Sequence, residues 1–215
     1  MPSLIWAFVE LLRRPDLARS LASEISRYSP SHGATYNVES LIELPLIGSI
    51  TAETARLRMA SIVTRVPKEH LQLDENWRVP KNTPILILSH DLSLNTTAWT
   101  KARPRTVKKP LTEYWAERFL MSNALQHKRT AAPSFSMNGL EHLNINAGNI
   151  SHPFLGCDFA KAIQASTLAV LLNEFEPQLC DPDLFDAVVP PARDIAFGTT
   201  KPLEKIAIRI RKRSG

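Results

Sequence analysis

An acid and a base stand three positions apart inside an apolar stretch of this chain. They are Glu53 and Arg56, and residues at this spacing lie on one face of a helix, where opposite charges can pair directly. The pair has two interpretations. On a surface it contributes little to stability, whereas in a core each charge depends on its partner, because an unpaired buried charge is costly. In both interpretations its role is structural and involves no bond chemistry.

A thiol is the second group with chemical potential. Cys157 stands at the expected start of a helix, where the helix N-terminus lowers the pKa of a thiol and favours the thiolate, the form that binds metals. The alternative is that Cys157 and Cys180 are small packed residues. The two cysteines have no paired spacing and follow no secretory leader, which indicates an intracellular, reducing compartment.

Helices and short strands are expected to position these groups. Pro15 and Asp16 suit the first turn of a second helix, and Leu17, Leu21 and Ile25 give it a narrow buried stripe. The expected elements are a helical pair over 1–28, a helix over 38–60 that carries Glu53 and Arg56, a sheet piece over 71–90, a loop region over 91–156, a helix over 157–175 and strands over 176–215.

Two local features sharpen this picture. Asn82 stands where a turn requires a positive φ, which asparagine tolerates better than most residues. Near the end of the chain Ile206, Ile208 and Ile210 alternate with polar or small residues, a pattern typical of a strand.

Composition and charge argue against a disordered chain, a membrane-spanning segment and a nucleic-acid-binding surface. Of 215 residues, 44% are apolar, which suits a packed core. The run Leu4–Leu12 is too short to span a bilayer, so no transmembrane segment is expected. The net charge is +5, with basic clusters over 101–109 and 205–213. These clusters lack interleaved aromatic residues and any known motif that recognises nucleic acid. Solvated surfaces are therefore favoured over nucleic-acid binding.

Three signatures occur in one order: Glu53–Arg56, Ala116–Phe119 and Gly156–Lys161. This order resembles the C-terminal half of a cytochrome P450, a haem-thiolate monooxygenase. The resemblance implies that residues 1–215 are a partial P450 domain of the α+β class, mainly helical with small antiparallel sheets. It also implies that Glu53 and Arg56 join Arg118 in a buried structural triad.

The resemblance implies haem b as cofactor. Arg65 resembles the arginine that pairs with a haem propionate, and Gly156 keeps its register in the haem loop. Phe154 occupies the position of the cysteine that binds iron. Cys157 is displaced from that position by three residues, which is most of a helical turn and ~4–5 Å along a helix axis. It is therefore a doubtful metal ligand.

The family's reaction is monooxygenation of a small hydrophobic substrate, with electrons from NADPH-cytochrome reductase, usually at the endoplasmic reticulum membrane. The motifs look most like fungal enzymes of secondary metabolism. The resemblance covers only about the latter half of a typical member, and Phe154 replaces the ligand cysteine, so the chain is expected to be a truncated and inactive member. A partial domain is also expected to leave part of Leu4–Leu12 exposed. The alternatives are a working monooxygenase that uses Cys157 or a longer gene product, and a non-enzymatic remnant that binds a partner.

Overall fold

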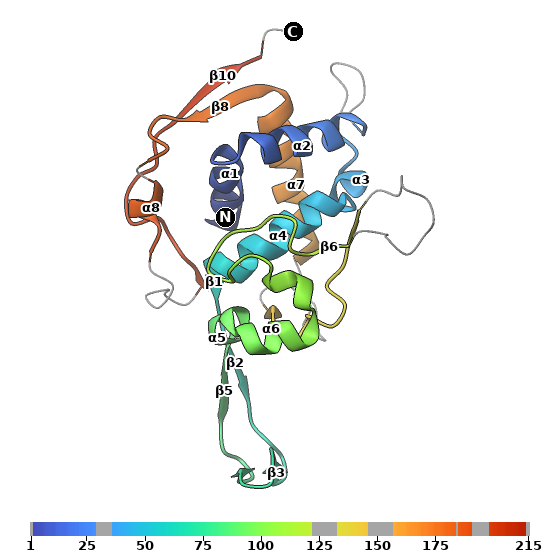
Figure 1. The fold of residues 1–215 in the computed structure, drawn as a ribbon, viewed down its shortest axis with the longest axis vertical. Helices are drawn as coiled ribbons and strands as arrows, with labels where there is room; N and C mark the ends of the chain where they lie inside the picture. Colours follow the sequence, from blue (N-terminus) through green and yellow to red (C-terminus); the bar gives the residue numbers. More distant parts are fainter. Residues whose placement is uncertain are drawn as a thin grey trace.

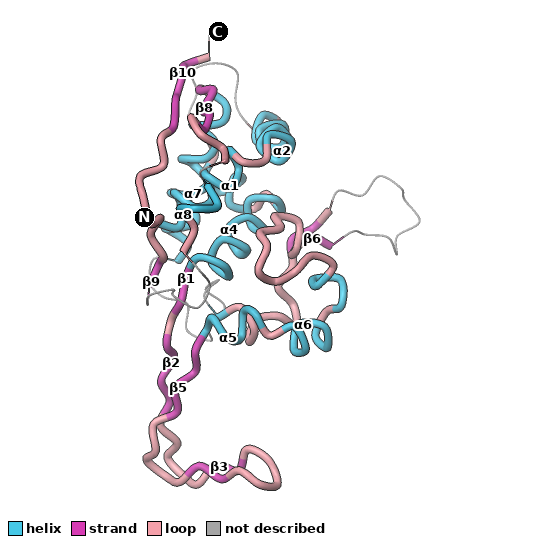
Figure 2. The backbone as a smooth tube through the Cα atoms, turned by 60° about the vertical axis from the view of Figure 1, so that its left-hand side comes forward, coloured by secondary structure: helices cyan, strands magenta, loops and turns pink. Residues whose placement is uncertain are grey.

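The computed structural model describes residues 2–28, 36–121, 133–145, 157–183, 185–190 and 198–213. A cluster of helices forms its body, and a narrow two-stranded arm projects from it (Figures 1 and 2). The helices of the body are α1 (Pro2–Leu12), α2 (Pro15–Ser26), α3 (Val38–Ile42), α4 (Pro45–Arg58) and α7 (Cys157–Asn173).

The core lies where these helices meet. Helix α1 contacts α2 and α4, and α7 contacts α2 and α3. The predicted stripe of α2 is confirmed, since Leu17, Leu21 and Ile25 are its buried residues. They join one apolar cluster with Leu11 of α1 and Leu168 of α7. Packing of apolar faces therefore holds the body together, as is normal for helices of this length.

The prediction that the first helix is partly exposed is wrong for most of its apolar side chains. Trp6 and Leu11 are fully buried, and only Ile5 is a large exposed apolar residue of α1. Trp6 packs edge-on against Phe185 of α8 (Phe185–Val188), with ring centroids 6.1 Å apart. Its Nε1 donates to the carbonyl of Thr200 at 2.6 Å. The later part of the same chain covers this helix.

The structure divides the expected helix over 38–60 into α3 and α4. The break lies before Pro45, because the residue that precedes a proline is pushed into an extended conformation, and Leu44 has φ −63° and ψ 123°. The C-terminal end differs as well. Met59 leaves the helix with an extended backbone and begins a strand.

Five two-stranded antiparallel sheets complete the described fold. They pair β1 (Met59–Ala60) with β9 (Gly198–Thr199), β2 (Ile62–Arg65) with β5 (Ile85–Leu88), β3 (Leu71–Gln72) with β4 (Arg78–Val79), β6 (Leu120–Met121) with β7 (Ser134–Phe135), and β8 (Phe175–Leu179) with β10 (Ile208–Lys212). The fold is thus α+β with small antiparallel sheets, as the resemblance implied.

The turn predicted at Asn82 and the strand predicted near the end of the chain have different outcomes. Asn82 has φ 65°, which confirms the predicted positive φ in the turn before β5. The alternating strand near the end of the chain begins at Ile208, so Ile206 lies before it. In β10, Ile210 pairs with Pro177 of β8, and its side chain is half exposed.

The region over 91–156 is not all loop. It contains α5, which already begins at 89 (Ser89–Leu94), α6 (Thr96–Ala102) and the short 3₁₀ helix η1 (Pro104–Val107). Asn95 caps α6, because its side chain accepts a hydrogen bond from the N–H of Ala98 at 3.0 Å. These helices are too short to show a clear apolar period, and prolines interrupt the region.

Candidate functional site

A buried carboxylate lies at the centre of the charged cluster. Glu53 on α4 is fully buried, as are Arg56 and Arg118. Both Glu53 oxygens accept from Arg56, with Nε to Oε2 and Nη2 to Oε1 each 2.8 Å. Nε of Arg118 lies 3.0 and 3.1 Å from the same two oxygens. The structure thus brings together the three residues expected to form a triad.

The main chain completes the environment of this carboxylate. The N–H of Trp115 donates to Oε1 of Glu53 at 2.9 Å. Burial alone would raise the pKa of Glu53, but the neighbouring charges of Arg56 and Arg118, with these hydrogen bonds, hold it below the ordinary 4.5. Glu53 is therefore ionised at neutral pH and acts as a fixed negative centre.

The remaining N–H groups of the two arginines donate to backbone carbonyls, which belong to Ser93 and to the segment 106–113. Arg56 Nη1 donates to Leu111 O at 2.6 Å and to Ser93 O at 3.1 Å. Arg118 donates to carbonyls at four positions, which are Thr106, Lys109, Pro110 and Glu113. This segment has little regular structure, so the arginines replace the hydrogen bonds that a helix or sheet would give it.

The sequence did not indicate a second buried charge cluster. Glu10 on α1 is fully buried and pairs with Arg58 at 2.6 Å and with Arg14 at 2.5 Å. The guanidinium of Arg58 lies over the Trp6 ring, 4.4 Å from its centroid. The cluster joins the end of α1 to the end of α4. Its sequence signal is weak, because Glu10 is a single acid in an apolar helix and Arg58 is 48 positions away.

Comparison with known proteins shows the family to which the chain belongs. The sequence profile of the cytochrome P450 family matches residues 2–136, which is more than half of the 215 residues. The chain belongs to the cytochrome P450 family.

Individual P450 proteins resemble it over longer stretches. Cytochrome P450 monooxygenase efuG of Hormonema carpetanum is 25% identical over 99% of the chain, and fsoE of Humicola fuscoatra is 29% identical over 99%. Cytochrome P450 monooxygenase calL of Penicillium decumbens is 25% identical over 84%. All three are fungal monooxygenases by name. The chain spans 41%, 39% and 32% of their respective lengths.

The residues that the P450 resemblance assigned to haem do not form a described site. Arg65 on β2 is exposed and donates from Nη1 to the carbonyl of its neighbour Thr64 at 2.9 Å. Phe154 and Gly156 lie outside the described residues, and Cys157 begins α7 with a side chain that is also outside them. Within the described ranges, no group of three or more His, Cys, Asp or Glu side chains could hold a metal ion.

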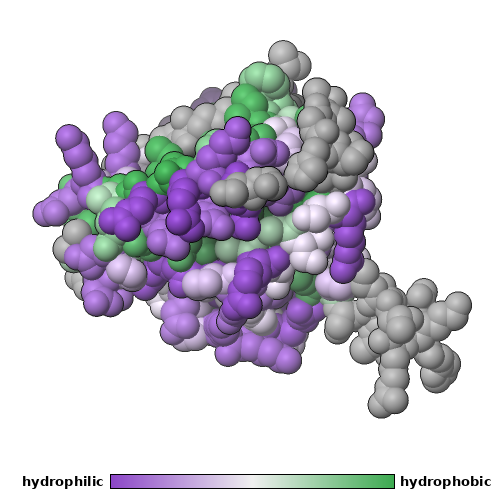
Figure 3. Space-filling model, turned by 90° about the horizontal axis from the view of Figure 1, so that it is seen from above, coloured by the Kyte–Doolittle hydropathy of each residue, from purple (hydrophilic) through white to green (hydrophobic). Residues whose placement is uncertain are grey.

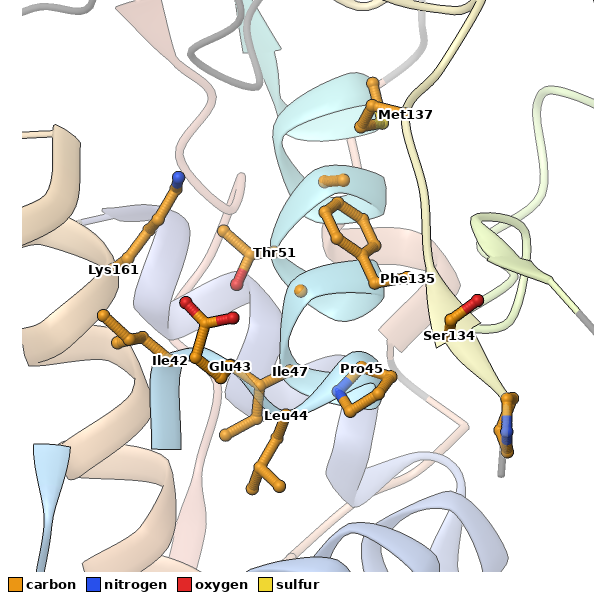
Figure 4. A pocket seen from close by; sticks show the side chains of 13 residues that line it. Ile42, Glu43, Leu44, Pro45, Ile47, Thr51, Ser134, Phe135, Met137 and Lys161 are labelled. Atoms are coloured by element: carbon orange, nitrogen blue, oxygen red, sulfur yellow. The ribbon is translucent and has the colours of Figure 1, made fainter. Parts of the chain in front are cut away.

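A cavity of about 410 Å³ opens beside the first half of α4. Figure 4 shows Glu43 and Lys161 on the side of Thr51, and Phe135 against α4 on the other side. Phe135 approaches so closely because α4 has a glycine there. A Cβ built on Gly48 would lie 2.9 Å from Phe135 Cγ. The P450 chain thus combines a helix glycine and an aromatic side chain at one wall of the cavity.

We expect Gly48→Ala to be stabilising only when Phe135 is absent. In a helix, alanine is favoured over glycine by about 1 kcal/mol, but in the wild type the Phe135 ring must move, which offsets this gain. In the Phe135→Ala background, Gly48→Ala should raise the free energy of unfolding by about 0.5–1 kcal/mol. Urea unfolding of the four chains measures the difference. An equal effect of Gly48→Ala in both backgrounds would contradict the close contact.

Proposed function

We propose that this chain is a P450 scaffold protein that does not carry out thiolate-dependent oxygenation by itself. The observation that carries the proposal is the residue at the iron-binding position. When the chain is aligned on Gly156 and the start of α7, Phe154 stands where the family has its cysteine. A phenyl ring has no donor atom for iron, so the donor set does not fit a haem-thiolate centre.

The other assigned residues give no replacement. The exposed guanidinium of Arg65 donates to its own backbone neighbour, and Cys157 is three residues from the ligand position. In contrast, the scaffold is well formed. All the charges of Glu53, Arg56 and Arg118 are satisfied by protein groups, which supports a structural role for the triad that is independent of a bound cofactor.

In a P450 with an intact thiolate, haem b would supply the oxidising centre for monooxygenation of a small hydrophobic substrate. We also propose that this chain is related to such enzymes of fungal secondary metabolism. Its exposed cations Lys101, Lys108 and Lys109 would suit an acidic electron-donating partner such as NADPH-cytochrome reductase.

Reduced, carbon-monoxide-bound spectra test the proposal. Purified chain mixed with haem should lack the long-wavelength Soret band of a thiolate ligand. Phe154→Cys should restore the ligand type, but it leaves the rest of the loop unchanged, so we expect at most weak haem retention and no turnover.

Cys157→Ser is the control for the alignment, and it should leave the spectrum unchanged. A thiolate-type spectrum in the unmodified chain that disappears in Cys157→Ser would overturn the proposal. That result would assign the ligand to Cys157 and favour a working monooxygenase.

A further inference from the structure

The turn after β7 contains the one place in the sequence where glycine follows asparagine, at Asn138 and Gly139. Both residues are exposed. The φ of Gly139 is 79°, that of Asn138 is not positive, and the N–H of Leu140 donates to the carbonyl of Met137 at 2.8 Å. This hydrogen bond and these φ values define a type II turn with Asn138 and Gly139 at its centre.

An asparagine that precedes glycine reacts with its own main chain, because glycine has no side chain to cover the attacking nitrogen. The nitrogen of Gly139 attacks Cγ of Asn138, and a C–N bond forms while the bond from Cγ to the side-chain nitrogen breaks. That nitrogen takes up the proton of the Gly139 N–H and leaves as ammonia, so a five-membered succinimide ring remains. Water then opens the ring to aspartate or to isoaspartate, whose main chain contains one more carbon.

The turn holds the reacting atoms apart. The ring contains Cα, Cβ, Cγ and the main-chain carbon of Asn138 together with the nitrogen of Gly139. Cβ and that nitrogen must therefore be nearly eclipsed about the bond from Cα to the main-chain carbon. In a type II turn the second residue has ψ of about +120°, which leaves the two atoms far from eclipsed. The peptide group between Asn138 and Gly139 must rotate before the attack.

Arg103 opposes this rotation. It is the residue that follows α6, and its Nη2 donates to the carbonyl of Asn138 while its Nη1 donates to the carbonyl of Ser136 at 2.9 Å. The carbonyl of Asn138 and the N–H of Gly139 belong to one planar peptide group. A rotation that brings the nitrogen towards Cγ therefore carries the carbonyl oxygen away from the guanidinium. Hydrogen bonds from a charged donor are stronger than neutral ones, so the turn opens rarely while Arg103 is in place.

We propose that Asn138 is a site of spontaneous conversion to aspartate and isoaspartate, and that Arg103 controls the rate by holding the turn closed. The conversion has a structural consequence. Met137 and Leu140, on either side of the pair, are buried in one apolar cluster with Trp99. An additional main-chain carbon between them disturbs this packing, so the isoaspartate form should unfold at a lower urea concentration than the original chain. The inference does not rest on the proposed function.

Peptide mapping of aged protein tests the proposal. The purified full chain is kept in mildly alkaline buffer, either folded or in concentrated urea, and then digested. Chromatography with mass spectrometry separates the asparagine, aspartate and isoaspartate forms of the peptide with Asn138. Conversion should be slower in the folded chain than in urea. Arg103→Gln should raise the rate in the folded chain about tenfold, because a charged hydrogen bond no longer has to be released. In urea, where the turn is absent, Arg103→Gln should have no effect.

Three further variants complete the test near the turn. Arg103→Lys keeps a cation but loses the two-pronged contact, so its rate should lie between those of the wild type and Arg103→Gln, and it decides the question if Arg103→Gln does not fold. Arg105 donates to Sδ of Met121 at 3.5 Å and not to the turn, so Arg105→Gln should react as the wild type does. Asn138→Gln would have to form a larger ring, so it should stay intact and keep its urea midpoint on ageing.

A distant control comes from the end of the molecule opposite the arm. This end presents mainly hydrophilic side chains, with a smaller band of hydrophobic ones (Figure 3), and within the described residues no helix could cross a membrane. Strand β10 lies at this end (Figure 1) and carries the exposed Arg209, so Arg209→Gln should not change the rate. Wild-type rates in both Arg103 variants, an equal increase in Arg105→Gln, or an intact Asn138 in urea would each overturn the proposal.

Discussion

Glu53→Gln should lower the free energy of unfolding by about 3–5 kcal/mol, the cost of breaking a buried ion pair on one side only. Glutamine has nearly the same shape as glutamate but no charge. The guanidinium groups of Arg56 and Arg118, both fully buried, would then face each other without a carboxylate between them. Domains of this kind are stable by only about 5–15 kcal/mol, so the loss is a large fraction of the total. Urea unfolding at neutral pH measures it as a lower midpoint.

Two controls separate the buried charge from a general effect. Glu117→Gln changes an exposed carboxylate one residue from Arg118 and should change stability by less than about 0.5 kcal/mol. The second control is acid pH. Because the pKa of Glu53 is lower in the folded chain than the ordinary 4.5, its contribution is present above the unfolded pKa and is lost as the pH falls through the folded pKa. The difference between wild type and Glu53→Gln should therefore shrink in acid, and a constant difference would count against the buried charge.

Local spacing in the sequence allowed part of this site to be predicted. The i,i+3 spacing of Glu53 and Arg56 requires only that the segment is helical, and the turn at Asn82 requires only that one residue has positive φ. The pairing of Arg118 with Glu53 could not be predicted from local spacing, because 65 positions separate the two residues. The resemblance to a family supplied that pairing, which no periodicity in the chain indicates.

The sequence predictions that the structure contradicts each failed for a physical reason. Pro45 stands in the expected helix over 38–60, and its effect on Leu44 divides the helix in two. The burial of Trp6 depends on Phe185 and Thr200, which lie far along the chain. The register of β3 and β4, which pairs Leu71 with Val79, could not be predicted from the sequence, since in a short strand pair a shift of one residue moves each side chain to the opposite face.

The second large effect on stability concerns the buried ion pair that the sequence did not indicate. Glu10 and Arg58 form a buried pair between two helix ends, and neither residue has another fully buried opposite charge beside it. Glu10→Leu alone should lower the free energy of unfolding by about 3–5 kcal/mol, because Arg58 remains buried without a carboxylate. Arg58→Leu alone should also be costly, although less so, because Arg14 still pairs with Glu10 at 2.5 Å and is one-third exposed.

The double variant Glu10→Leu/Arg58→Leu distinguishes a need for charge from a need for packing. Replacement of both members of a buried ion pair by apolar residues is often neutral, so the double variant should be more stable than Glu10→Leu alone. Arg14→Gln serves as the matched control, since it removes the partly exposed partner and should cost only about 1 kcal/mol. Urea unfolding of all four variants completes the cycle. Additive losses would mean that the two residues act separately, whereas recovery in the double variant would show that the ion pair matters because each buried charge requires the other.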